Sequence, residues 1–220
     1  MKEKKMNIKQ SKLIEYSIIS LIIFIIGVIV VSFTTLFRNI DNYILFNLPF
    51  FWTDLLTKIM IVITSVVSTE VIIIMSLIFF VWFLFKHEKA KAIIIFLVPS
   101  ITATIIWLLK KIIQRARPIG YQLIMETRNS LPSGHTTMAV VFFGALFYLF
   151  YDKIKYKKTA IISAIAIVLL VGVSRIYLGV HWFSDIIISV FLGLSLLFGY
   201  IYLIRKYKFF DKNRKIILKK

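Results

Sequence analysis

Long apolar stretches divide this chain along most of its length. The hydrocarbon core of a bilayer is about 30 Å thick, so a helix needs roughly 17–25 mostly apolar residues to cross it. Residues 16–37 are free of charge and long enough to cross once. Four further apolar stretches lie at 92–109, 131–151, 159–174 and 186–204. The pattern predicts an all-α integral membrane protein.

The composition agrees with a membrane protein and excludes several other classes. Of the 220 residues, 60% are hydrophobic and the mean hydropathy is +0.88, whereas a soluble domain needs about half its residues polar to cover its surface. Cysteine is absent, which excludes a disulfide framework and a thiolate metal site. The net charge of +18 would suit a nucleic-acid-binding protein, but the apolar stretches leave no soluble domain to carry a basic face.

Residues 59–85 form one apolar stretch that is too long for a single untilted span and carries Glu70 near its middle. Ser68, Thr69 and Glu70 are typical of a helix start, with a hydroxyl cap and an acid in the first turn. We therefore expect a span at 69–85, preceded by a helix at 52–67 that lies at the membrane surface. The alternative makes Glu70 a buried intramembrane acid, and therefore a functional candidate itself.

The resulting bundle has six transmembrane helices, with both termini on the same side of the membrane. If the N-terminus is inside, the inner segments carry 20 of the 28 Lys and Arg residues; these segments are 1–15, 86–91, 152–158 and 205–220. Positive residues favour the cytoplasmic side, where anionic lipid attracts them. We therefore expect cytoplasmic termini. Residues 1–220 are expected to form a single membrane domain, because no repeat or linker interrupts them.

Under this topology several polar residues meet at the outer membrane face. They come from the ends of different spans: Lys110, Arg117, His135, Arg175, His181 and Asp185. The Ser133-Gly134 turn before a helix presents free N–H groups to an anion. His181 and Asp185 are four residues apart, so we expect them to share a helix face and form a hydrogen bond. Together these groups predict an electropositive anion-binding site.

Each feature also has a simpler interpretation. Lys110 and Arg117 could be ordinary interfacial cations, the Ser133-Gly134 turn could merely begin a helix, and a lone His–Asp pair is more often structural than catalytic. Lys111, Arg115 and Arg128 are expected to attract anionic headgroups or to be solvated, and Glu126 to gate access to the site.

The spacing of the polar residues resembles that of a known family. Its three motifs look like Lys110 followed after six residues by Arg117-Pro118, then Pro132-Ser133-Gly134-His135, then Ser174-Arg175 followed by His181 and Asp185. In this the chain resembles the type 2 phosphatidic acid phosphatase (PAP2) superfamily, which includes bacterial phosphatidylglycerophosphate and undecaprenyl-diphosphate phosphatases. The resemblance covers about residues 92–204.

The resemblance implies a membrane phosphatase that acts through a phosphohistidine. His181 would be the nucleophile, Asp185 would orient it, and His135 would serve as general acid and then general base. The groups expected to bind the phosphate are Lys110, Arg117, Ser133, Gly134 and Arg175. We expect no metal or other cofactor, because these cations stabilise the charge that Mg²⁺ stabilises in other phosphoryl-transfer enzymes.

A site at helix ends beside lipid favours a substrate with a membrane-embedded tail and an anionic head. We expect undecaprenyl diphosphate at the outer face of a bacterial plasma membrane, with phosphatidylglycerophosphate, phosphatidic acid or a lipid phosphotransfer reaction as alternatives. The expected partners are this lipid and the surrounding membrane, with no nucleic acid and no obligate protein. A transporter is disfavoured, because transporters place ionisable groups near the bilayer midplane.

Overall fold

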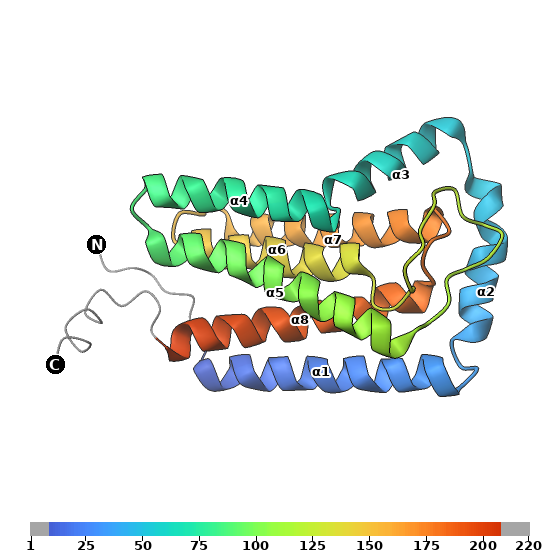
Figure 1. Cartoon of the computed structure of the whole chain (residues 1–220), viewed down its shortest axis with the longest axis horizontal. Helices are drawn as coiled ribbons and strands as arrows, with labels where there is room; N and C mark the ends of the chain where they lie inside the picture. Colours follow the sequence, from blue (N-terminus) through green and yellow to red (C-terminus); the bar gives the residue numbers. More distant parts are fainter. Residues whose placement is uncertain (1–8, 208–220) are drawn as a thin grey trace.

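The computed structural model describes residues 9–207, which form a bundle of helices (Figure 1). The elements are α1 (Gln10–Phe33), α2 (Arg38–Asn47), the 3₁₀ helix η1 (Leu48–Phe51), α3 (Asp54–Val66), α4 (Thr69–Phe85), α5 (Lys89–Ile113), α6 (Gly134–Phe150), α7 (Lys157–Tyr177) and α8 (Phe183–Lys206). No β-strand occurs between residues 9 and 207. The prediction of an all-α protein is confirmed.

Every stretch predicted as a span contains most of a helix, but length and composition alone do not give six spans. Four helices, α1, α5, α7 and α8, are long and apolar enough to cross a membrane. Helices α3 and α4 pass that test only as a pair, bent by 47°. Helix α6 is apolar but has 17 residues, because Ser133 caps it three residues into the predicted stretch. For the described part of the chain the number of possible spans by these criteria is therefore four, or five with the bent pair.

The break between α3 and α4 lies where the sequence predicts a helix start. Ser68 has extended backbone angles, and its Oγ accepts a hydrogen bond from the backbone N–H of Val71 at 3.2 Å. Glu70 follows in the first turn of α4, with an exposed side chain. An acid in the first turn interacts favourably with the positive end of the helix dipole. Glu70 therefore lies at a helix end instead of inside a continuous helix.

Close packing between α6 and α8 holds the centre of the bundle. A Cβ on Gly193 of α8 would lie 2.7 Å from the Cβ of Val140 on α6, so only glycine permits this approach. Helices in lipid associate through such van der Waals contacts, because lipid tails are as apolar as the side chains they replace. Helix α1 runs beside α8 (Figure 1), and Ser17 Oγ donates to the carbonyl oxygen of Ser195 at 2.8 Å.

The two ends of the bundle differ in their polar residues. At one end Glu88 pairs with Lys91 at 2.8 Å and with Lys153 at 3.3 Å, which brings the segments 86–91 and 152–158 together. The two segments therefore lie at the same end of the bundle. Helix α2, which the sequence did not predict, crosses the opposite end (right in Figure 1). The predictions for segments 1–8 and 208–220 lie outside the described residues.

Candidate active site

A cavity of about 500 Å³ lies between the start of α4, the second half of α5, the segment 114–133 and the start of α6. Six of the eight predicted site residues line it: Lys110, Arg117, Gly134, His135, Arg175 and His181. They come from α5, the segment 114–133, α6, α7 and the segment 178–182. Both histidines therefore face the same cavity, although 46 positions of sequence separate them.

His181 and Asp185 are hydrogen-bonded, but not along one helix. His181 Nδ1 lies 3.3 Å from Asp185 Oδ2, and both residues are almost completely buried. Helix α8 begins only at Phe183, because Trp182 is extended and acts as its N-cap residue. The prediction that the pair shares a helix face is therefore wrong. Asp185 reaches back from the first turn, where Oδ2 also accepts from the Trp182 backbone N–H at 3.1 Å.

The surroundings of His181 favour its neutral form. Burial lowers the pKa of His181 well below 6.5, and the charges of Arg117 and Arg175 lower it further. Burial is the larger of these causes. With Nδ1 held by Asp185, the other ring nitrogen, Nε2, faces the Arg117 guanidinium, 3.3 Å from NH1. A neutral imidazole with one nitrogen hydrogen-bonded to a carboxylate can act as a nucleophile through the other.

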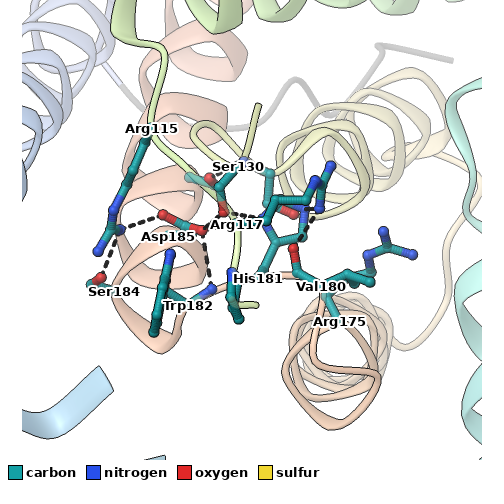
Figure 2. A network of polar contacts seen from close by, with 12 residues as sticks. Arg115, Arg117, Ser130, Arg175, Val180, His181, Trp182, Ser184 and Asp185 are labelled. Atoms are coloured by element: carbon teal, nitrogen blue, oxygen red, sulfur yellow. Dashed lines mark hydrogen bonds and ion pairs between the residues drawn. The ribbon is translucent and has the colours of Figure 1, made fainter. Parts of the chain in front are cut away.

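Asp185 is held by several donors (Figure 2). Arg115 donates to Asp185 Oδ1 and Ser130 Oγ donates to Oδ2. Arg115 also donates to Ser184 Oγ at 2.9 Å. The expectation that Arg115 is solvated or binds headgroups is therefore wrong, since its guanidinium pairs with a buried carboxylate. Its place two residues before Arg117 was the only sequence signal for this role.

Arg117 joins the two segments of chain that border the cavity. Its guanidinium donates to the carbonyl oxygens of Arg128 and Val180, and forms an ion pair with Glu126 at 3.3 Å (Figure 2 shows the contact with Val180). Segment 114–133 thereby packs against segment 178–182. Arg117 is thus fixed beside His181 by contacts within the protein.

Arg175 is the most deeply buried of the site cations, with a relative exposure of 1%. One of its terminal nitrogens donates to Thr64 Oγ1 of α3 at 2.9 Å, and the other pairs with Glu126. Its Nε is buried without a hydrogen-bond partner among residues 9–207. Glu126 therefore bridges Arg117 and Arg175, the two arginines of the predicted phosphate site. A carboxylate between two guanidiniums indicates a place that suits an anion.

The N-terminus of α6 differs in part from the expectation. Gly134 and His135 line the cavity, but Ser133 is fully buried and does not. Its hydroxyl caps the helix by accepting from the Thr136 N–H at 3.5 Å, and its own N–H donates to Ser189 Oγ at 2.6 Å. In this structure Ser133 therefore shapes the helix end instead of facing the cavity.

Gly179 allows the segment that carries His181 to pack against its neighbour. Its φ is +66°, in the region that favours glycine, and a Cβ would lie 2.7 Å from the carbonyl carbon of Tyr121. Next to it, the Leu123 N–H donates to the Leu178 carbonyl oxygen at 3.0 Å. The path of the chain into His181 therefore depends on the absence of a side chain at Gly179.

Some residues of the site carried no clear sequence signal. Asp41 comes from α2, Thr64 from α3, Ser130 from the segment 114–133 and Ser184 from the first turn of α8. Each contacts the site through the tertiary fold. The partner of a single acid or hydroxyl group cannot be predicted from the residues that surround it in the sequence.

Comparisons with known proteins agree with the motifs. Residues 101–209 match the PAP2 superfamily. Phosphatidylglycerophosphatase B from Bacillus subtilis (strain 168) is 39% identical over 94 residues, which is 41% of this chain and 46% of the relative. The chain thus aligns with about half the length of that curated relative.

The fold has a counterpart among solved structures. The crystal structure of the first transmembrane PAP2 type phosphatidylglycerolphosphate phosphatase from Bacillus subtilis matches with a TM-score of 0.81 and 26% identity, covering 86% of this chain and 96% of that one. Among residues 9–207, four helices are also long and apolar enough to cross a membrane. These findings show that the chain carries a PAP2 superfamily domain and support a membrane protein.

Proposed function

We propose that this protein is a lipid phosphate phosphatase that works through a phosphohistidine. The observation that carries the proposal is the single cavity lined by both histidines and by Lys110, Arg117 and Arg175, with Asp185 bonded to His181. A neutral nucleophile, a second titratable group and a cluster of cations are the parts that phosphoryl transfer needs.

The reaction has two steps. In the first, His181 Nε2 attacks phosphorus, the bond to the leaving oxygen breaks, and His135 donates a proton to that oxygen. The N–H at Nδ1 remains with Asp185, which stabilises the positive charge of the phosphorylated imidazole. In the second, His135 takes a proton from water, whose oxygen attacks phosphorus, and the P–N bond breaks to release phosphate and neutral His181.

The cations stabilise the charge that develops on the equatorial phosphoryl oxygens. Lys110, Arg117 and Arg175 line the cavity, and the buried Nε of Arg175 is a donor without a partner among residues 9–207. The backbone N–H of Gly134 at the start of α6 adds a dipole of the same sign. We retain Ser133 as a contributor through its capping of α6, which orients this helix end.

The shape of the cavity supports a substrate with a lipid tail. Beyond the polar residues it is lined by Ala103, Ile106 and Trp107 of α5 and by Thr69 of α4. These residues extend the cavity along the sides of membrane-type helices. A tail in the bilayer could lie against them while the phosphate reaches the histidines.

The relatives favour phosphatidylglycerophosphate as the headgroup to test first, because both are named for its hydrolysis. Undecaprenyl diphosphate, the first expectation from the sequence, is the second candidate. The proposed contacts bind only the terminal phosphate, so they do not select between the two lipids. Transfer of the phosphoryl group to a lipid alcohol would use the same intermediate with a different acceptor.

We propose that the chain lies in a bacterial plasma membrane with six spans and both termini in the cytoplasm. Helices α4 and α6 would then complete the set of α1, α5, α7 and α8, with α3 at the outer surface and the cavity facing outward. The Lys-rich segments 86–91 and 152–158, which meet at the other end, support the inner assignment.

The proposal is tested by phosphate release in detergent from phosphatidylglycerophosphate, undecaprenyl diphosphate and phosphatidic acid, with His181→Ala as the control. We expect release from at least one lipid by the wild type and none by the variant. Release that His181→Ala matches, or no release from any lipid phosphate, would overturn it.

A further inference from the structure

Arg115 connects the proposed catalytic pair to a helix outside the matched region. Its guanidinium pairs with Asp185 Oδ1 through one terminal nitrogen and with Asp41 Oδ2 at 2.8 Å through the other (Figure 2 shows the contact with Asp185). The exposed fractions of the two carboxylate side chains are 0% and 2%. One guanidinium thus forms ion pairs with two buried acids from two different helices, α2 and α8.

Asp41 holds this arrangement in place. Its Oδ1 accepts from the Ser184 N–H at 2.9 Å, and its Oδ2 accepts from Ser184 Oγ at 2.6 Å. Ser184 is the residue before Asp185, in the first turn of α8. Asp41 therefore fixes the start of α8 and one end of Arg115 together, so that the other end of Arg115 meets Asp185.

The charge balance around His181 explains why this contact matters. The charged and titratable groups that act on it are Asp185 of α8, Arg115 and Arg117 of the segment 114–133, Lys110 of α5, Arg175 of α7 and His135 of α6, with Glu126 paired to the two arginines. A buried carboxylate needs a positive partner. If Arg115 were absent, Asp185 could obtain one only by binding a proton itself or by sharing one with His181.

Either outcome would disable the nucleophile. A protonated Asp185 no longer stabilises the positive charge that forms on the ring, and a protonated His181 has no lone pair for attack. Because Arg115 supplies the positive charge from the side of Asp185 opposite the imidazole, Asp185 can remain ionised while His181 remains neutral.

We propose that Arg115, held by Asp41, is a positioning residue that keeps Asp185 ionised and His181 neutral. The inference rests on the proposed function for its effect on turnover. Its effect on the protonation of His181 does not depend on any substrate, so the two can fail separately.

The experiment compares Arg115→Gln, Arg115→Lys and Asp41→Asn with a matched control, Arg38→Gln. Arg38 is exposed and lines the same smaller cavity of about 300 Å³ as Asp41 and Arg115, without an ion pair to Asp185. For each variant the thermal unfolding temperature is measured, with kcat and KM for p-nitrophenyl phosphate across pH. The ¹⁵N signals of His181 are followed by NMR titration without substrate.

We expect Arg115→Gln to lower kcat by about 10- to 100-fold with KM nearly unchanged. Removing a residue that orients a functional side chain from behind typically reduces activity by about this factor. The acid limb of kcat and the NMR titration of His181 should both move to higher pH. Arg115→Lys should restore part of the loss, Asp41→Asn should show a smaller change in the same direction, and Arg38→Gln should behave as the wild type.

Two results would overturn the inference. One is an Arg115→Gln protein whose His181 titrates as in the wild type. The other is a loss of activity that follows the loss of folded protein without any change in the pH profile. If the NMR shift appears but the wild type hydrolyses no phosphate ester, the inference stands and the proposed function fails.

Discussion

Gly179→Ala tests whether the path of the chain into His181 controls activity. An L-residue at positive φ costs about 1–2 kcal/mol. In addition, the new Cβ would lie 2.7 Å from the carbonyl carbon of Tyr121 and 3.3 Å from the Gln122 nitrogen, so backbone must move. Overpacking of this kind adds about 1–3 kcal/mol. The total is a destabilisation of about 2–5 kcal/mol.

Gly120→Ala is the matched control. Gly120 also has a positive φ, +85°, and lies in the segment 114–133, but a Cβ there meets nothing within 4 Å. It therefore carries the backbone strain without the clash, about 1–2 kcal/mol. The comparison separates strain from displacement of the segment that ends in His181.

The assay measures thermal unfolding in detergent and kcat/KM with p-nitrophenyl phosphate. We expect both variants to unfold at lower temperature than the wild type, Gly179→Ala more so. Since misplacement of a reacting group by 1 Å costs about 100-fold in rate, kcat/KM should fall by about that factor in Gly179→Ala and by less than about threefold in Gly120→Ala. Equal losses in the two variants would refute the reasoning.

Four further predictions concern the chemistry of the site. The pKa of His181 is lowered well below 6.5, and attack requires the neutral ring. We therefore expect kcat/KM for p-nitrophenyl phosphate to stay constant as the pH falls through 6.5; a decrease in kcat/KM with its midpoint at or above that pH would contradict this. His135→Ala should still form a phosphoenzyme from p-nitrophenyl phosphate, whose leaving group needs no proton, and this is detected after quenching in alkali because the P–N bond is labile to acid. Phosphoenzyme formation from lipid phosphates should be slow; an equal loss of phosphoenzyme formation with both substrates would reject the role of His135 as general acid. Glu126→Gln removes the counter-ion between Arg117 and Arg175, so we expect vanadate to inhibit about tenfold more strongly. Glu70→Gln is the control, because Glu70 lines the same cavity and forms no ion pair among residues 9–207; equal shifts would mean that only long-range charge matters. Activity should survive EDTA, while strict dependence on added Mg²⁺ would argue against charge stabilisation by the arginines and lysine.

The sequence was sufficient to locate the parts of the site that stand at helix ends. Lys110, His135, Arg175 and His181 each adjoin an apolar stretch whose length the bilayer dictates. Because successive spans alternate in direction, the predicted topology places all four at the same end of the bundle. All four line the cavity. The helix start at Ser68 was equally visible, because capping is a local property of the chain.

The remainder depends on contacts that no local pattern encodes. Helix α2 is short and mixed in polarity, so neither its length nor the spacing of its apolar residues predicted a helix there. Its Asp41 is informative only once Arg115 and Ser184 are seen beside it. The spacing of His181 and Asp185 suggested a helical pair, but α8 begins only at Phe183, after its N-cap residue Trp182, so His181 lies outside the helix. In each case the tertiary environment determines what the side chain does.

The bridge formed by Glu126 bears on how the site behaves when it is empty. The cluster holds four cationic side chains, Lys110, Arg115, Arg117 and Arg175, and three carboxylates, Asp41, Glu126 and Asp185. Like charges in a medium of low polarity repel strongly, so a cluster without Glu126 would depend on a bound anion to remain intact. On the proposed function, the carboxylate of Glu126 and the phosphate of the lipid then take turns as the anion beside the arginines in each catalytic cycle. Departing phosphate is replaced by a group already attached to the chain, which lets the product leave without exposing bare positive charge.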